Sequence, residues 1–372
     1  MVNCHICGGE LKSIPSFSSL FQVTSDCRPW PSKGELAVCT KCFIVQKPKS
    51  VKWVNEINDI YKGYQIYLQG NGVEQSTFDP TSGASLARSQ KILSWIKGLS
   101  IPTNGKLLDV GCGNGSFMKA FNHEYPNWEM TGLELDDKNK SIVESIKGVK
   151  KLHVGEVDTL DEKYDLIVLI HALEHITEPI YLLQKIKNIL NPGGFLFIEV
   201  PDLKTSPFDL LIADHCSHFT IDTLSNVVVN AGYEIVNKIA DFVPKELSLL
   251  ASIQNENKSQ GLYIDESSES IALDNIEWMK SLLSKALNCN ENIAVFGTSI
   301  SATWLATTLG DKVSFFVDED SNRIGGKHLG KDILEPEKVV ENYTVLMPLR
   351  TDIANNVSRR LIAKGIKLNF II

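Results

Sequence analysis

Two Cys-x-x-Cys pairs near the start of the chain have the spacing of metal ligands: Cys4 with Cys7, and Cys39 with Cys42. Four thiolates suit a tetrahedral ion in a closed, structural site, and zinc is the metal that prefers such a set. A catalytic zinc would keep an open position and include histidine or carboxylate ligands. His5, inside the first pair, is an alternative ligand, and a thioredoxin-like redox motif is the alternative function. The second pair favours one structural zinc held by the four cysteines.

A glycine-rich turn follows a short apolar run in the segment LLDVGCGNG, which begins at Leu107. The pattern predicts a strand, a tight turn and a helix, and nucleotides bind at the carboxyl end of such a strand. Gly111 and Gly113 have no side chain and let the backbone approach a ligand closely, and Gly115 completes a GxGxG spacing. This spacing differs from the GxGxxG fingerprint and from a P-loop. An unrelated Rossmann-type turn is the alternative interpretation.

Acidic residues end the next two predicted strands. Glu134, with Leu135 after it, lies about twenty residues beyond the glycine turn, where a carboxylate accepts hydrogen bonds from ribose hydroxyls. Glu156 ends the following strand, where a carboxylate meets an adenine amino group, and Val157 comes next. The carboxyl ends of parallel strands lie at one edge of a sheet. We therefore expect these residues to line the same nucleotide site as the glycine turn.

Histidines follow the last two strands of this series. His171 and His175 come after the buried run YDLIVLI, and both are expected to face the cleft, or one of them to orient its loop. The segment PFDLLIADHCSHF follows the strand FIEVP and carries three further candidates, namely Asp214, His215 and His218. A carboxylate beside an imidazole raises its basicity and fixes its tautomer. We expect Asp214 to orient His215 as a general base, and the alternative is that His215 and His218 are packing residues.

The elements that must position these residues fall into three regions. Residues 1–75 hold the cysteine pairs and many turn signals, which is typical of a small module that folds around a metal. Residues 76–244 alternate strand-like and helix-like patterns, which predicts a parallel, doubly wound sheet. The expected strands are 106–110, 129–135, 164–170 and 195–200, and the expected helices are 117–124, 138–146 and 180–190. Residues 245–372 repeat the alternation on a smaller scale and predict a second α/β unit, with strands 292–296, 313–317 and 345–347 and helices 273–288, 301–309 and 352–364.

Composition excludes several classes of partner. Asp and Glu exceed Lys and Arg by 45 to 37, so a nucleic-acid backbone is not an expected partner. No apolar run reaches membrane-spanning length, and the opening MVNCHICGG has no secretory pattern. We expect a cytoplasmic protein that has reduced thiols and acts on a small molecule. The sequence predicts no particular oligomeric state.

Taken in order, the four motifs from Leu107 onward resemble those of the class I S-adenosylmethionine-dependent methyltransferases. The resemblance extends to about Val236 and implies a Rossmann-like α/β fold with S-adenosylmethionine as cofactor. It implies that the three glycines border the methionine and ribose, that Glu134 holds the ribose, and that Glu156 and Val157 flank the adenine. Three further cofactor-binding candidates occupy the same strand ends: Asp109, Leu135 and His171.

The three-part layout is similar to that of the zinc-containing sugar C-methyltransferases, which methylate nucleotide-linked 4-keto deoxysugars. Members of that family carry a Tyr-x-Glu-His segment, and here its last two positions are Asp214 and His215. The tyrosine position is Ile212, so the resemblance leaves the identity of the base to another residue. The C-terminal region, with Gly297 after one predicted strand and Asp318 after the next, looks like the family's substrate-enclosing domain. A lid without a ligand of its own is the alternative.

The leading hypothesis is C-methylation of a nucleotide-linked sugar beside its ketone, with His215 removing the proton and the C-terminal domain enclosing the substrate. The carbonyl acidifies the neighbouring C–H, and the enzyme's task is to orient the reactants and exclude water. His175 and His218 are the other catalytic candidates. O-methylation of a sugar hydroxyl or another small metabolite is the second hypothesis, because an imidazole serves a hydroxyl equally well. A non-catalytic binding protein is the third.

Overall fold

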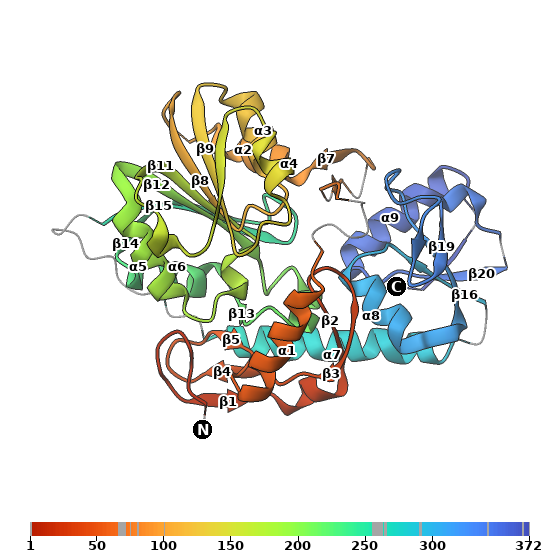
Figure 1. The fold of residues 1–372 in the computed structure, drawn as a ribbon. Helices are drawn as coiled ribbons and strands as arrows, with labels where there is room; N and C mark the ends of the chain where they lie inside the picture. Colours follow the sequence, from red (N-terminus) through yellow and green to blue (C-terminus); the bar gives the residue numbers. More distant parts are fainter. Residues whose placement is uncertain are drawn as a thin grey trace.

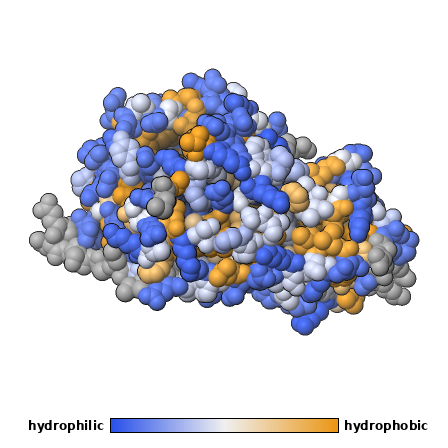
Figure 2. All heavy atoms as spheres, turned by 90° about the horizontal axis from the view of Figure 1, so that it is seen from below, coloured by the Kyte–Doolittle hydropathy of each residue, from blue (hydrophilic) through white to orange (hydrophobic). Residues whose placement is uncertain are grey.

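The computed structural model describes residues 2–65, 72–74, 76–79, 82–99, 101–254, 263, 266–289, 292–340, 342–366 and 368–371. Three bodies are visible in Figure 1: a small N-terminal part below, a central sheet with its helices above it, and a C-terminal α/β unit to one side. Helix α7 (Ser268–Leu287) runs beneath the last two and connects them along the chain. Seen from below, the surface is mostly hydrophilic, with hydrophobic side chains in scattered patches (Figure 2).

The N-terminal part is built on short strands rather than on a large core. Its four-stranded sheet has the order β1-β4-β5-β13, and β13 (Ser217–His218) comes from far downstream in the chain. A separate ribbon pairs β2 with β3. Ser50 accepts a hydrogen bond from the Trp53 amide and thereby caps α1. The elements are β1 (Leu11–Ser13), η1 (Pro15–Ser19), β2 (Phe21–Val23), β3 (Pro29–Lys33), β4 (Ala37–Cys39), β5 (Val45–Gln46) and α1 (Val51–Lys62).

The central sheet has seven strands in the order β10-β9-β8-β11-β12-β15-β14. The first five are parallel, while β15 is antiparallel to both of its neighbours, β12 and β14. This arrangement confirms the predicted Rossmann-like α/β fold with a large central sheet. The strands are β8 (Gly105–Val110), β9 (Trp128–Glu134), β10 (Val149–Val154), β11 (Tyr164–Ile170), β12 (Leu190–Pro201), β14 (Tyr233–Ala240) and β15 (Glu246–Ile253).

Helices cover both faces of this sheet, as the near-continuous apolar run of β11 requires. Ile167 and Leu169 pack into one core with α5 and α6, whereas Leu166 and Val168 pack into a second core with α2 and α3. The split follows from the two-residue period of a strand. The covering elements are the hairpin β6 (Ser76–Phe78) and β7 (Ser85–Ala87), then α2 (Arg88–Ile96), α3 (Ser116–Glu124), α4 (Lys140–Glu144), α5 (Pro179–Ile189) and α6 (Ile221–Asn230).

The C-terminal unit has a sheet of order β18-β19-β17-β16-β20-β21. Its elements are β16 (Asn292–Phe296), α8 (Ile300–Leu309), β17 (Val313–Val317), β18 (Lys327–His328), β19 (Lys331–Leu334), β20 (Tyr343–Leu346), α9 (Thr351–Ala363) and β21 (Asn369–Ile371). Strand β15 begins after the boundary predicted at residue 244, yet its residues 246–252 pair with β12, and Ile253 pairs with β14 in the same sheet. The short connection before β15 joins two neighbouring strands of one sheet. Gln75, at the other predicted boundary, lies outside the described residues, and the division into domains stays a prediction.

One apolar core joins all three bodies. It contains Phe17 and Leu20 from the N-terminal part, Leu210 and Ile212 from the loop after β12, and Trp304 of α8. The loop after β12 therefore packs against both the N-terminal part and the C-terminal unit, which are far apart in the sequence. No helix among the described residues is long and apolar enough to span a membrane.

Candidate active site

The glycine turn after β8 requires glycine for backbone reasons. Gly111, Gly113 and Gly115 have φ angles of 74°, 58° and 79°, which lie in the left-handed region that other residues rarely adopt. The Gly113 amide donates to Oε1 of Glu134 at 2.6 Å, so the turn and the end of β9 are tied together. A Cβ on Gly111 would lie 3.2 Å from the Cβ of Ala172. The turn therefore lies directly against the loop that follows β11.

The predicted cofactor residues lie at the carboxyl ends of three neighbouring strands. Asp109, on β8, is 2% exposed, and burial together with the charge of Glu134 raises its pKa to about 8. Burial also raises the pKa of Glu134. Beyond these strand ends, Leu135 is 77% exposed, Glu156 is exposed and Val157 is buried. A glycine turn with open backbone and an anchored acid beside it suits an adenosyl group, so these residues fit the predicted cofactor.

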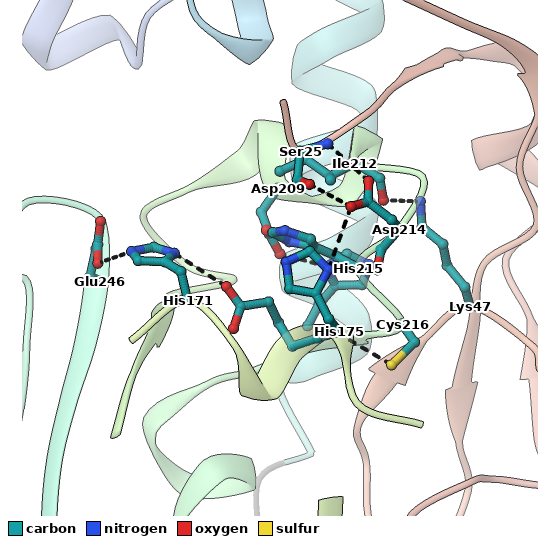
Figure 3. A network of polar contacts seen from close by, with 12 residues as sticks. Ser25, Lys47, His171, His175, Asp209, Ile212, Asp214, His215, Cys216 and Glu246 are labelled. Atoms are coloured by element: carbon teal, nitrogen blue, oxygen red, sulfur yellow. Dashed lines mark hydrogen bonds and ion pairs between the residues drawn. The ribbon is translucent and has the colours of Figure 1, made fainter. Parts of the chain in front are cut away.

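Two imidazoles meet between the segments that follow β11 and β12. His175 ends η4 (Leu173–His175), and His215 follows η5 (Pro207–Leu211). Their ring centroids are 4.5 Å apart with an interplanar angle of 82° (Figure 3). Nδ1 of His215 lies 2.6 Å from Oδ1 of Asp209, and His215 is 4% exposed. The structure thus brings together two of the predicted catalytic histidines, with Asp209 as a partner that the sequence did not predict.

The predicted pairing of Asp214 with His215 is wrong. Asp214 instead accepts hydrogen bonds from the amide (2.9 Å) and the hydroxyl of Ser25, and its Oδ2 lies 3.5 Å from Nδ1 of His175. Its backbone carbonyl accepts a hydrogen bond from the same Nδ1 at 3.1 Å, and the Tyr61 hydroxyl lies 3.1 Å from that atom. Ala213 and Asp214 lie in a turn that the His215 amide closes by donating to the Ile212 carbonyl at 3.3 Å. Asp214 therefore supports His175 rather than its own neighbour.

These contacts fix the tautomers of the two rings. An ionised carboxylate and a carbonyl oxygen can only accept, so Nδ1 carries the proton in both rings and Nε2 keeps its lone pair. Among the described residues, no hydrogen bond uses Nε2 of His175 or His215. Burial opposes protonation of His215, but the charge of Asp209 outweighs it and raises the pKa. In His175, burial and the neighbouring His215 lower the pKa.

The other two candidate histidines have different surroundings. His218 is 1% exposed; its Nδ1 lies 2.5 Å from Oδ2 of Asp209, and its Nε2 is buried without a partner in the described part of the chain. His171 lies between two carboxylates: its Nε2 is 2.5 Å from Oε2 of Glu246, and its Nδ1 is 3.2 Å from Oε1 of Glu174. Burial disfavours its charged form, but Glu246 and Glu174 together raise its pKa to about 9. His171 is thus held as a cation next to the pair, and its role as a cofactor ligand stays a prediction.

Lys47 of the N-terminal part contacts the segment that carries His215. The buried ammonium group of Lys47 donates to the carbonyl of Ile212 at 2.5 Å and to the side chain of Gln22 at 2.8 Å. Burial lowers the pKa of Lys47 to about 7 despite the nearby charges of Asp209 and Asp214. The Ile212 side chain belongs to the shared apolar core. The position that is tyrosine in the sugar C-methyltransferases therefore has a packing role in this chain.

The four cysteines of the N-terminal pairs converge, with sulfur atoms within 4.8 Å of one another. Cys4 and Cys42 sulfurs are 3.6 Å apart, and Cys7 and Cys39 sulfurs are 3.5 Å apart. A tetrahedral zinc with bonds of about 2.3 Å needs sulfur–sulfur distances of about 3.8 Å. The cluster fits such an ion. His5 is directed elsewhere, because its Nε2 lies 2.8 Å from the hydroxyl of Ser217.

Comparisons with known proteins agree with this geometry. Residues 86–238 match the family model described as a methyltransferase domain. This part of the chain is a class I S-adenosylmethionine-dependent methyltransferase domain. A ubiquinone biosynthesis O-methyltransferase of Paracidovorax citrulli is 29% identical over 136 residues, which cover 32% of this chain and 53% of that protein. A tRNA U34 carboxymethyltransferase of Nautilia profundicola is 33% identical over 104 residues, which cover 26% and 34% of the two chains.

Among solved structures, an S-adenosylmethionine-dependent methyltransferase from Clostridium acetobutylicum is 14% identical, with a TM-score of 0.38 over 54% of this chain and 99% of that one. The chain spans about half the length of the first curated relative, 53%. Both cysteine pairs and Lys47 lie outside the matched methyltransferase domain, as does the whole C-terminal unit.

The site of the methyltransferase domain contains residues that sequence reasoning missed. Asp209 lies in the same segment as His215, so a search for carboxylates one or two turns away would have found it. Tyr61, Ser25 and Lys47 come from the N-terminal part, and no motif connects them to the histidines. Their positions depend on the pairing of β13 with β5, which is a tertiary contact.

Proposed function

We propose that this protein transfers a methyl group from S-adenosylmethionine to a small-molecule acceptor, and that the His175–His215 pair takes the proton that the acceptor loses. The observation that carries the proposal is the position of the pair. The loop that holds His175 packs against Gly111 of the donor turn through Ala172. A base placed beside the methyl donor is the arrangement that methyl transfer to a weakly acidic group requires.

The donor site is proposed to comprise the glycine turn and the ends of β9 and β10. S-adenosylmethionine, when bound, supplies an electrophilic methyl group on a cationic sulfonium. Glu134 is held by the amides of Gly113 and Leu135 and is directed toward the ribose position. Val157 provides an apolar contact for the adenine, and the exposed side chain of Glu156 is available to its amino group.

Proton removal is assigned to Nε2 of His215. Asp209 holds the proton on Nδ1, so Nε2 is the atom that accepts. Once His215 is doubly protonated, the carboxylate of Asp209 stabilises the imidazolium, which is the role of an orienting acid in a catalytic pair. His175 lies against His215 and is supported by Asp214, which makes it the second group that can accept or relay the proton.

Two acceptors fit this chemistry. The three-part layout supports a nucleotide-linked keto sugar, in which the carbonyl acidifies a C–H group and His215 removes its proton. O-methylation is the second candidate, and the similarity to several ubiquinone biosynthesis O-methyltransferases favours it. The same pair would deprotonate a hydroxyl group equally well.

We also propose that the four cysteines bind one structural zinc. The sulfur distances support this, as do amide hydrogen bonds to the sulfurs of Cys4 and Cys39. The cluster leaves no histidine or carboxylate for an open coordination position, so we assign no catalytic role to this metal.

A product screen tests the proposed function. The full-length protein is incubated with S-adenosylmethionine and a panel of keto sugar nucleotides and phenols, and products are analysed by mass spectrometry. We expect one methylated product, and NMR of that product then distinguishes carbon from oxygen as the methylated atom. His123→Ala, at a surface histidine, is the matched control for His215→Ala. A protein that does not bind S-adenosylmethionine by calorimetry would contradict the proposal.

A further inference from the structure

We infer that Glu174, His175 and His215 form a second binding site for a divalent cation of the zinc class, separate from the cysteine cluster, and that an ion bound there inhibits the enzyme. One oxygen of Glu174 and one nitrogen of each imidazole lie within 4.8 Å of one another. The site is therefore compact enough for three bonds of about 2.0–2.2 Å to one ion after small side-chain rotations.

The second observation concerns Glu174. The residue is fully buried at 0% exposure. Its Oε1 lies 3.2 Å from Nδ1 of His171, whereas its Oε2 is buried with no hydrogen-bond partner in the described part of the chain. A buried carboxylate oxygen without a partner is costly and calls for an ion, a proton or a water. Beside two imidazole lone pairs, a metal ion satisfies all three groups at once.

The surroundings of the two imidazoles match those of metal ligands. Histidines that bind metals almost always donate their other ring N–H to a carboxylate or a backbone carbonyl. Here Nδ1 of His215 donates to Asp209, and Nδ1 of His175 donates to the carbonyl of Asp214, with its carboxylate at 3.5 Å. Both rings are thereby fixed with Nε2 as the free nitrogen, as a metal site requires.

The ligand set selects the ion. Two imidazoles and one carboxylate suit zinc, cobalt or iron, whereas magnesium and calcium prefer sites made of oxygen. Three carboxylates surround the pair, from Glu174, Asp209 and Asp214, and the two cationic groups near them are His171, whose Nδ1 lies 3.2 Å from Glu174, and the buried Lys47. The local charge balance therefore favours a divalent cation.

Inhibition follows from the identity of the ligands, and this step rests on the proposed function. An ion on Nε2 of His215 occupies the lone pair that would take the proton of the acceptor. The ion and the acceptor proton therefore compete for the same atom. Zinc at the cysteine cluster stabilises the fold, whereas zinc at the histidine pair prevents turnover.

Equilibrium dialysis against zinc tests the site without donor or acceptor. We expect the full-length wild-type protein to bind one more zinc per chain than His215→Ala or Glu174→Gln, while His123→Ala binds as much as wild type. Counting the difference makes the result independent of the ion at the cysteine cluster. Equal zinc content in wild type and both site variants would overturn the inference.

Cobalt spectroscopy of the wild-type protein covers the case in which a variant does not fold. Cobalt in the cysteine cluster gives a sulfur-to-cobalt charge-transfer band, and cobalt at the histidine pair gives visible bands without it. We expect both signals in sequence during a titration, and the absence of the second would overturn the site. In a turnover assay, Glu174→Gln should raise the half-inhibitory zinc concentration by about 10–100-fold or more. Zinc binding without any methyl transfer would leave the site intact and contradict only the proposed function.

Discussion

Asp209 holds His215 and His218 at the same time: its Oδ1 lies 2.6 Å from Nδ1 of one ring and its Oδ2 lies 2.5 Å from Nδ1 of the other. Burial alone would raise the pKa of this carboxyl, but the two imidazoles outweigh it and hold the pKa below the ordinary range. Asp209 is therefore ionised throughout the physiological pH range. It fixes the tautomer of His215 and stabilises the charge that His215 gains.

Asp209→Asn should reduce turnover by about 10²–10⁴-fold, because an amide both removes the charge and permits the wrong tautomer. Affinity for S-adenosylmethionine should stay within about twofold of wild type, since Asp209 lies outside the glycine turn. Steady-state kinetics and calorimetry check the two expectations. Asp222→Asn, at a surface aspartate paired with Lys238, is the matched control. Near wild-type turnover of Asp209→Asn would remove this residue from the mechanism.

Gly113→Val should abolish S-adenosylmethionine binding while the protein remains folded. The position has a φ of 58°, and a branched side chain there is strained and fills the space proposed for the donor. Gly193→Ala is the matched control, because Gly193 also has a positive φ of 79° but lies near the amino end of β12, whereas the donor turn follows the carboxyl end of β8. Calorimetry reports donor affinity, and circular dichroism reports the fold. Unchanged affinity in Gly113→Val would place the donor elsewhere.

Glu134→Ala should weaken S-adenosylmethionine binding by about 1–3 kcal/mol, the cost of leaving charge-assisted ribose hydrogen bonds unmade. The carboxylate is positioned by the Gly113 amide at 2.6 Å, so the loss also loosens the turn. Glu129→Ala changes an exposed glutamate on the same strand and is the control. A donor affinity equal to that of wild type would contradict the assignment.

The central sheet could be predicted because its strands carry local signals. The expected strands 164–170, 292–296 and 313–317 coincide with β11, β16 and β17, since each is a short apolar run bounded by turn residues. The start of β12 shows the limit of this approach. The sequence predicts strand 195–200, but the turn residues Pro192 and Gly193 lie inside a longer strand, Leu190–Pro201, whose pairing with β11 is irregular at its start.

The partners of the histidines could be predicted only in part. Adjacency in sequence favoured Asp214 as the partner of His215, but Asp214 lies in a turn and contacts Ser25 and His175 instead. The correct partner, Asp209, is six residues earlier and is brought back by the η5 turn. The Tyr61 hydroxyl, on α1 of the N-terminal part, contacts Nδ1 of His175. Lys47, which directly follows β5, donates a hydrogen bond to the carbonyl of Ile212. Contacts of this kind depend on tertiary packing, which periodicity and spacing do not encode.

Freshly purified protein should contain zinc at the cysteine cluster, and Cys39→Ser should release it and lower the melting temperature. Metal binding to four thiolates contributes folding free energy to a part of the chain with a small core. The loss should also reduce turnover, because β5 pairs with β13 and Lys47 holds the carbonyl of Ile212. Elemental analysis and thermal melts check this, with Cys289→Ser as the control. Absence of zinc from the fresh wild-type protein would contradict the prediction.

Turnover should rise with pH through a pKa above about 6.5, the ordinary value of histidine. The charge of Asp209 raises the pKa of His215 against the effect of burial, so at pH values below that pKa the imidazole is already protonated and cannot accept the acceptor's proton. Asp209→Asn removes the strongest influence that raises this pKa and leaves only the weaker effects of Glu174 and Asp214 against burial, so the rising limb should move to lower pH while the maximum rate falls. A purely structural role for Asp209 would lower the rate without moving the limb. Lys47 is the rival titrating group, because burial lowers its pKa to about 7. The variant Lys47→Met distinguishes the two groups: if His215 is the base, the rising limb of the pH profile of this variant should stay where it is in wild type.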